Sequence, residues 1–268
     1  MKAELSGVPE TLLITVRARA EETERRDSLL NDPYAVNILK KLHFDVSTKD
    51  KVDPASQIGV VVRTQVFDRI VTDFLNRNPE GIVIALGCGL DARYERLQLP
   101  CAAWYDLDLP ESIDIRKSFF KERGNYKMIA QSMLDYSWMD SLEANKPLLI
   151  ISEGVFMYFS EEDIKPLVLA VFKRFPHAEM AFDTIPPFLA KRSNLHTEIR
   201  KYNAPFKWGL DRAEDLKKWD DHIEVIGSEY TMNHYLKRWP LSMLLLRLIP
   251  KINRGTKTVH IKYTQCLQ

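Results

Sequence analysis

The spacing of apolar residues predicts that the first part of the chain is helical. Residues 8–24 and 32–42 carry apolar side chains at helical spacing, and Asp32-Pro33 supplies an N-cap followed by proline at the first helical position. Between residues 58 and 75 apolar side chains again recur every three or four positions. We therefore expect three helices before the first strand.

The pattern then changes to short, continuously apolar runs of strand length. These runs cover residues 82–86, 104–107, 128–130, 148–151 and 180–182. Helix-like segments lie between them, notably 110–121 and 160–175, and the second of these opens with Ser160 and has Asp163 three positions later. Strands that are buried on both faces and alternate with helices predict a parallel, doubly wound α/β sheet.

The last third of the chain predicts an insertion followed by a strand pair. Residues 184–222 are too long for a simple connection, and we interpret them as a lid insertion with a helix start at Asp211. Strands at 223–231 and 257–264, with a helix at 241–249 between them, are typical of an antiparallel pair that closes the sheet. We therefore predict one domain with four parts: a helical cap (1–78), a cofactor-binding core (79–183), the lid (184–222) and C-terminal strands (223–268).

Composition narrows the class of partner. The chain has 268 residues, 45% of them hydrophobic and 28% charged, with a formal net charge of +1, so it resembles an ordinary globular protein with no overall attraction for nucleic acid or membranes. Three cysteines without a CxxC spacing argue against a disulfide framework or a zinc site. The longest apolar stretch, 241–249, contains Arg247 and is too short to span a bilayer. We expect a cytoplasmic protein with a small-molecule partner and no metal; the oligomeric state stays open.

The turn after the first predicted strand carries the strongest chemical signal, in the sequence IVIALGCGLDARY. Gly87 and Gly89 allow the backbone to turn sharply and to approach a ligand where a Cβ would collide. Asp108 ends the next strand, 21 positions after Gly87, which is the spacing of a carboxylate that binds both ribose hydroxyls. Together these residues predict a cofactor that contains adenosine.

The glycine pattern alone does not choose the cofactor. Gly87, Gly89 and Ala92 also satisfy the relaxed dinucleotide fingerprint, so an NAD-dependent oxidoreductase and a catalytically silent binding module both remain alternatives. Asp91 lies where a pyrophosphate would approach the following helix, and a fixed anion there would repel it. S-adenosylmethionine carries an ammonium and a sulfonium instead, and a carboxylate favours both.

Several stretches in the same order resemble one protein family. They are TLLITVRARAEET, LLNDPYAV, VVRTQVFDRIV, IVIALGCGLDARYERL, WYDLDLPESIDIRK, SMLDYSWMD, LLIISEGVFMYFSEEDI and APFKWGLD. From about residue 10 to about residue 235 the chain is similar to the leucine carboxyl methyltransferase family, especially to bacterial members that methylate polyketide carboxyl groups. The resemblance implies a class I S-adenosylmethionine-dependent methyltransferase with a seven-stranded sheet. It implies O-methylation of a carboxylate, or another oxygen, of a small polyketide-like acceptor; methylation of a protein's C-terminal leucine is the alternative.

The resemblance also implies roles for individual residues. Gly87 and Gly89 would line the methionine part of the cofactor, Asp108 would hold the ribose, and Ser132 and Met133 would flank the adenine. Arg63, with Arg19 or Arg17, would meet the cofactor carboxylate, and Glu153 would meet its ammonium. The predicted cofactor set is completed by Cys88, Asp91, Leu109 and Gly154. Many class I enzymes have an acid two residues before the first glycine; here Ala85 stands there, and Glu153 is expected to replace it.

The acceptor side is less well marked. Tyr158 would border the acceptor pocket and is the candidate catalytic residue, while Arg192 and Trp208 in the lid are candidates for binding the substrate. A carboxylate, with a pKa of about 4, is already ionised at neutral pH and needs no general base, whereas a phenol normally does. The six histidines are scattered without a His-Asp or His-Glu signature, which favours carboxyl methylation.

Overall fold

Three helices precede the sheet, as the sequence predicts. The computed structural model describes residues 11–42, 51–191, 205–254 and 256–264. Helix α1 spans Thr11–Thr23, α2 spans Pro33–Lys41 and α3 spans Pro54–Arg77. The Asp32 carboxylate caps α2 by accepting a hydrogen bond from the backbone N–H of Ala35 at 3.0 Å. Helix α3 begins four residues before the predicted start because a second Asp-Pro pair, Asp53-Pro54, caps it.

The sheet has seven strands in the order β3-β2-β1-β4-β5-β7-β6. The strands are β1 Ile82–Leu86, β2 Ala103–Asp108, β3 Tyr126–Ala130, β4 Leu148–Ser152, β5 Ala178–Thr184, β6 Ile223–Tyr230 and β7 Lys257–Tyr263. Strands β1 to β5 are parallel, and β7 is antiparallel to both β5 and β6. This topology confirms the predicted doubly wound sheet and its antiparallel closing pair. The strand order reverses between β1 and β4, where ligands bind in such sheets.

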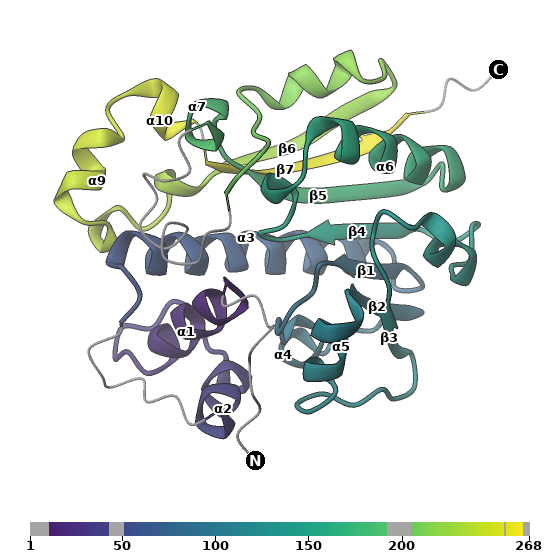
Figure 1. Cartoon of the computed structure of the whole chain (residues 1–268), viewed down its shortest axis with the longest axis horizontal. Helices are drawn as coiled ribbons and strands as arrows, with labels where there is room; N and C mark the ends of the chain where they lie inside the picture. Colours follow the sequence, from purple (N-terminus) through teal and green to yellow (C-terminus); the bar gives the residue numbers. More distant parts are fainter. Residues whose placement is uncertain (1–10, 43–50, 192–204, 255, 265–268) are drawn as a thin grey trace.

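Helices cover both faces of the sheet because the side chains of the buried strands alternate in direction. Ile82 and Ile84 of β1 pack into the cluster that contains Ile164 and Leu167 of α6, Glu161–Arg174. Val83, between them, packs into the opposite cluster, which contains the apolar side chains of α3. Figure 1 shows α3 running along the sheet, with α1 and α2 below it beside α4, Arg93–Leu97, and α5, Pro110–Arg116.

The remaining elements are short. They are the 3-10 helices η1 Tyr136–Ser141, η2 Phe156–Tyr158, η4 Ala213–Lys218, η5 Thr231–Asn233 and η6 Leu236–Arg238, and the helices α7 Pro187–Ala190, α9 Leu241–Leu246 and α10 Pro250–Asn253. The predicted capping box is confirmed, since Ser160 and Asp163 cap each other's backbone N–H groups. None of the helices in the described ranges is long and apolar enough to cross a membrane, and those ranges hold no cluster of metal-ligating side chains.

Three predicted helices differ in extent from the observed ones. The helix expected at 110–121 ends at Arg116, because the chain turns there and Phe120 packs its ring against the Arg116 guanidinium at 4.3 Å. The helix expected from Asp211 is the 3-10 helix η4, and the helix expected at 241–249 ends at Leu246. The domain boundaries at 78/79, 183/184 and 222/223 remain predictions.

Candidate cofactor and acceptor site

The loops after β1 and β4 touch each other, and glycine makes this contact possible. Gly87, Gly89 and Gly154 have φ angles of 68°, 48° and 74°, a left-handed conformation that other residues rarely adopt. A Cβ on Gly87 would lie 2.5 Å from Cγ2 of Val155, and one on Gly89 would lie 2.5 Å from Cδ2 of Leu12 in α1. The glycine turn is therefore enclosed by the β4 loop and by the start of α1.

Asp108 lies directly beside this turn. One carboxylate oxygen accepts a hydrogen bond from the Gly89 backbone N–H at 2.7 Å, and the other accepts one from Leu109 N–H at 2.8 Å. Burial raises the pKa of Asp108 above its usual value. A carboxylate has about four acceptor positions, and the Ser112 side chain occupies a third one, so one remains for a hydroxyl of a diol such as that of ribose. The neighbouring Leu109 side chain is half exposed and offers an apolar surface next to the carboxylate.

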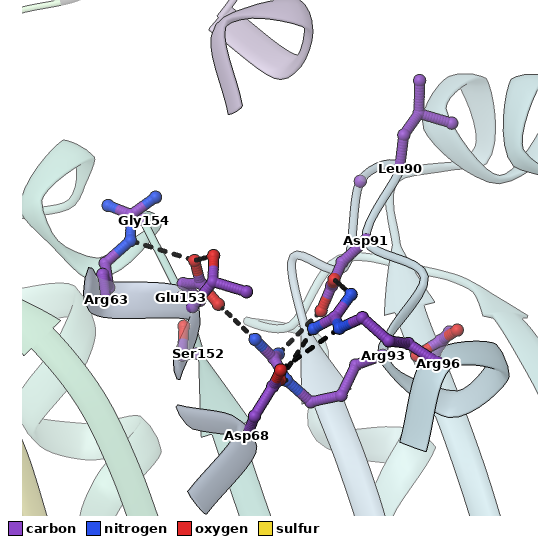
Figure 2. A network of polar contacts seen from close by, with 12 residues as sticks. Arg63, Asp68, Leu90, Asp91, Arg93, Arg96, Ser152, Glu153 and Gly154 are labelled. Carbon is purple, nitrogen blue, oxygen red and sulfur yellow. Dashed lines mark hydrogen bonds and ion pairs between the residues drawn. The ribbon is translucent and has the colours of Figure 1, made fainter. Parts of the chain in front are cut away.

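Glu153, in the loop after β4, joins the two sides of the site through arginines (Figure 2). Its Oε1 accepts a hydrogen bond from Arg63 Nε at 3.0 Å and its Oε2 accepts one from Arg93 Nη2 at 2.6 Å. Burial by itself would raise the pKa of Glu153, but Arg93 and Arg63 outweigh burial and hold the pKa below its usual value. The carboxylate is therefore ionised at neutral pH.

Arg93 is the centre of a second set of contacts that sequence reasoning missed. Its guanidinium also binds Asp68 of α3 through Nε at 2.7 Å and Asp91 through Nη1 at 2.7 Å. Arg96 contacts the same Asp68 at 2.7 Å and reaches Asp32 at 3.3 Å. The available signal was the pair of arginines three residues apart immediately after the glycine turn, which places both on one face of α4.

The environment of Asp91 corrects one argument made from the sequence. Asp91 is not an isolated anion, because Arg93 and Arg96 face it and, with Arg19, hold its pKa far below the usual range against the opposing effect of burial. Its repulsion of a pyrophosphate is therefore largely neutralised, so Asp91 alone does not discriminate against NAD.

Arg63 and Arg19, which were predicted to bind the cofactor carboxylate, already donate hydrogen bonds to other residues of the protein. Arg63 donates from Nη1 to Asp183 at 3.0 Å in addition to its bond to Glu153, and the other oxygen of Asp183 accepts from Gly154 N–H at 2.5 Å. In the described part of the chain Arg63 Nη2 has no hydrogen-bond partner, so this amino group is available to a ligand. The buried Arg19 binds Asp32 at 2.9 Å and the Leu90 carbonyl at 3.2 Å.

The charges of this cluster do not cancel. Its members are the guanidinium groups Arg19, Arg63, Arg93 and Arg96 and the carboxylates Asp32, Asp68, Asp91, Glu153 and Asp183. With every group ionised, the four cations and five anions sum to −1. A site of this kind favours a ligand with net positive charge. We call these nine residues the charge cluster.

Tyr158 is the last residue of η2, in the loop that also carries Glu153. Its ring packs 5.3 Å from the ring of Phe206, next to the apolar side chains of Met157 and Ile185. Burial raises the pKa of Tyr158 to about 12. The phenol is therefore protonated at neutral pH, so it is suited to donate a hydrogen bond to an acceptor and unsuited to act as a base.

The other predicted site residues occupy less informative positions. Trp208 is buried, and its ring lies near those of Phe182 at 6.0 Å and Trp219 at 5.7 Å, so it packs in the core; its contact with a substrate remains a prediction. Arg192 lies outside the described residues. Cys88 is buried, and burial raises its pKa well above the usual value, in keeping with a small space-filling thiol.

The two residues predicted to flank the adenine, Ser132 and Met133, have different surroundings. The Ser132 hydroxyl accepts a hydrogen bond from the backbone N–H of Leu134 at 3.2 Å, and the Met133 side chain is buried in the main core. Both residues follow β3. They lie at the same edge of the sheet as Asp108, where the parallel strands end, because β2 and β3 pair Asp108 with Ala130. Their contact with adenine remains a prediction.

Comparison with known proteins defines the class. Solved structures share the fold: a putative methyltransferase from Thermobifida fusca covers 92% of the chain, matched over 94% of its own length, with a TM-score of 0.59 at 14% identity. Magnesium protoporphyrin IX methyltransferase from Synechocystis, solved with bound S-adenosylmethionine, covers 94% of the chain over 97% of its length, with a TM-score of 0.51 at 12% identity. The sheet order is the one found in class I S-adenosylmethionine-dependent methyltransferases, and the chain is a methyltransferase of this class.

Sequence relatives place the chain within that class. The leucine carboxyl methyltransferase family matches residues 12–172, which is more than half of the chain, and the chain belongs to this family. It is 31% identical over 214 residues to the tetracenomycin polyketide synthesis O-methyltransferase TcmP of Streptomyces glaucescens, covering 80% of this chain and 79% of the relative. It is 28% identical to the S-adenosylmethionine-dependent methyltransferase dpfgK of Gibberella zeae, covering 95% and 93%. The predicted family is thus confirmed.

Proposed function

We propose that this protein transfers a methyl group from S-adenosylmethionine to a carboxylate of a small, polyketide-like acceptor. The observation that carries the cofactor assignment is the net charge of −1 on the charge cluster. S-adenosylmethionine carries an ammonium, a sulfonium and a carboxylate and is a net cation, whereas the pyrophosphate makes NAD a net anion. This sum supports the cofactor assignment where Asp91 alone does not.

The chain's own residues fit such a cofactor. The turn at Gly87 and Gly89 is closed to larger side chains by Val155 and Leu12, and Asp108 beside it has one free acceptor position for a ribose hydroxyl. Glu153 is ionised and, besides its bonds from Arg63, Arg93 and the Thr64 hydroxyl, has one acceptor position left for an ammonium, while Arg63 Nη2 offers an unused donor to a carboxylate. When bound, the cofactor supplies an electrophilic methyl group on sulfur.

The remaining task of the protein is to align the acceptor with that methyl group and to exclude water. A carboxylate acceptor is a ready nucleophile and needs no proton transfer. Within the described ranges, three histidines that have a carboxylate partner bind Asp220, Glu229 and Glu179, all outside the charge cluster. With Tyr158 also held protonated, the described site offers no strong base near the acceptor side, which supports a carboxylate over a phenol.

The experiment that tests this proposal uses the purified chain with methyl-labelled S-adenosylmethionine. The acceptors are an aromatic polyketide carboxylic acid, the same compound with the carboxyl group removed but its phenols retained, and a peptide that ends in leucine. We expect label in the first product only, and we expect mild alkali to release it as methanol, because esters hydrolyse and aryl ethers do not. Label on the decarboxylated phenol would contradict carboxyl methylation, and label on the peptide would identify the protein-directed alternative.

A further inference from the structure

The segment around α9 and α10 exposes an unusual amount of apolar surface. Leu241 and Leu248 are each 74% exposed and Leu245 is 61% exposed. Leu246 and Ile249 are also exposed. Figure 1 places α9 at the outer edge of the molecule, near one end of α3. We call these five residues, together with the exposed cations Lys237, Lys251 and Arg254, the α9 surface.

The inner side of the same segment is apolar too. Met243, Leu244 and Ile252 pack against the core cluster formed by α3, and Trp239 lies within that cluster. A helix that is apolar all round is normally covered on every side. Contiguous exposed apolar side chains of this kind mark a surface that contacts another body.

The charges around this segment indicate what kind of partner would bind there. Residues 231–268 contain seven lysines and arginines and no aspartate or glutamate, which leaves 31 Lys and Arg against 37 Asp and Glu in residues 1–230. The basic end therefore has a formal charge of +7 and the rest of the chain −6, although Arg238 and Lys262 pair with carboxylates of the rest of the chain and Lys257 is buried. Lys237, Lys251 and Arg254 are exposed and form no ion pair with a carboxylate of the described residues.

We propose that the α9 surface docks on an anionic lipid bilayer. A short apolar helix flanked by cations lies in the interface of such a bilayer, with its leucines among the acyl chains and its cations among the headgroups. Nucleic acid would satisfy the cations but leave the leucines in water. The whole-chain charge of +1, from which we expected no membrane partner, averages this basic end with an acidic remainder and so conceals it.

The position of the α9 surface connects it with the acceptor side of the fold. The Nζ atom of Lys251 in α10 lies 5.6 Å from the ring centroid of Phe188 in α7. The next residues of α7, Leu189 and Ala190, pack in the small cluster that includes Met157 and Tyr158. A bilayer beneath α9 would therefore lie next to the elements that border the candidate acceptor pocket.

The test is cosedimentation of the full chain with vesicles. The probes are phosphatidylcholine vesicles and phosphatidylcholine vesicles that contain phosphatidylglycerol, each at low and high salt. We expect binding to the anionic vesicles and weaker binding at high salt. Lys251→Gln/Arg254→Gln should weaken binding by about 25-fold at low salt, since each cation near an anionic surface contributes about fivefold. Leu241→Ser/Leu248→Ser should weaken binding by about tenfold or more.

The control is Lys217→Gln/Lys218→Gln, which removes two exposed cations on η4, one of which, Lys218, pairs with Asp215 at 2.9 Å; it should leave binding unchanged. All substituted side chains are exposed, so unaltered melting temperatures would confirm that each variant folds. Absence of vesicle binding by the unaltered chain would overturn the proposal. So would a dimer in solution that Leu241→Ser/Leu248→Ser converts to a monomer, because a second copy would then cover the surface. Equal loss of binding in the η4 control would also overturn it, since any cation would then suffice.

Discussion

Replacing Arg93 with methionine tests whether the charge cluster supports the fold at the site. The Arg93 side chain is 2% exposed and contacts three carboxylates, Asp68, Asp91 and Glu153, at 2.7, 2.7 and 2.6 Å. Methionine fills a similar volume but removes one cation from among three carboxylates; Asp68 keeps Arg96 and Glu153 keeps Arg63, whereas Asp91 keeps only Arg96 at 3.6 Å. Removing one partner from a buried ion pair costs about 3–5 kcal/mol.

That free energy corresponds to a large change in melting temperature. At about 2–4 °C per kcal/mol for a protein of this size, Arg93→Met should lower the melting temperature by roughly 6–20 °C. The measurement is thermal unfolding followed by circular dichroism. Arg93→Lys keeps the charge but loses the forked geometry, so its melting temperature should fall between those of Arg93→Met and the unaltered chain.

Two further variants make the reasoning refutable. Asp91→Asn/Arg93→Met removes the carboxylate whose nearest remaining ion-pair partner in the described residues is Arg96 at 3.6 Å, and it should recover part of the loss. Arg212→Gln is the control, because Arg212 is exposed and faces the exposed Glu214 at 3.6 Å, and it should change the melting temperature very little. A fall of less than about 3 °C for Arg93→Met, or no recovery in the double variant, would refute the claim that Arg93 neutralises these carboxylates.

Three more predictions follow from single contacts. Asp108→Asn should weaken S-adenosylhomocysteine binding by roughly 10- to 150-fold in calorimetry, the equivalent of about 1.5–3 kcal/mol for hydrogen bonds to a charged group, and unchanged affinity would remove Asp108 from the ribose site. Gly87→Ala should lower both the melting temperature and cofactor affinity, because its Cβ would lie 2.5 Å from Val155; a variant with unaltered melting and affinity would show that this loop has room. Burial would raise the pKa of Glu179, but hydrogen bonds from His260 and Arg77 lower it to about 2. The stability it contributes is therefore complete above about pH 4.5 and lost as the pH falls towards 2. Glu179→Gln should unfold less steeply with acid than the unaltered chain over that window, and parallel curves in urea titrations would contradict this assignment.

The sequence predicted the parts of the fold that depend on local patterns. Apolar runs bounded by turn residues marked the strands, and the glycine turn and Asp108 marked the ends of β1 and β2, because each of these signals directly follows or ends the strand that it marks. Long-range ion pairs carry no such signal. Arg93 and Glu153 are 60 positions apart, and nothing in either local pattern shows that they meet.

The environments of two side chains were misjudged for other reasons. Asp91 looked like a free anion although its partners Arg93 and Arg96 follow it two and five positions later, because the backbone of the turn decides which neighbouring side chains meet. Trp208 looked like a candidate pocket wall because an aromatic side chain in an insertion has the same sequence signature whether it packs inwards or outwards. Periodicity identifies an apolar face, but the partner of that face is decided by the tertiary fold.

Helix α3 has a consequence for how substitutions in this protein would act. Its 24 residues form a rod about 36 Å long. Gly59 near one end lies against Trp239, Arg63 and Asp68 in the middle hold the charge cluster, and Arg77 at the other end binds Glu179 of the central sheet. One continuous element therefore contacts the C-terminal segment, both sides of the charge cluster and the far edge of the sheet. A substitution that shortens or kinks α3 would disturb all three places at once, whereas one in a loop would disturb one of them.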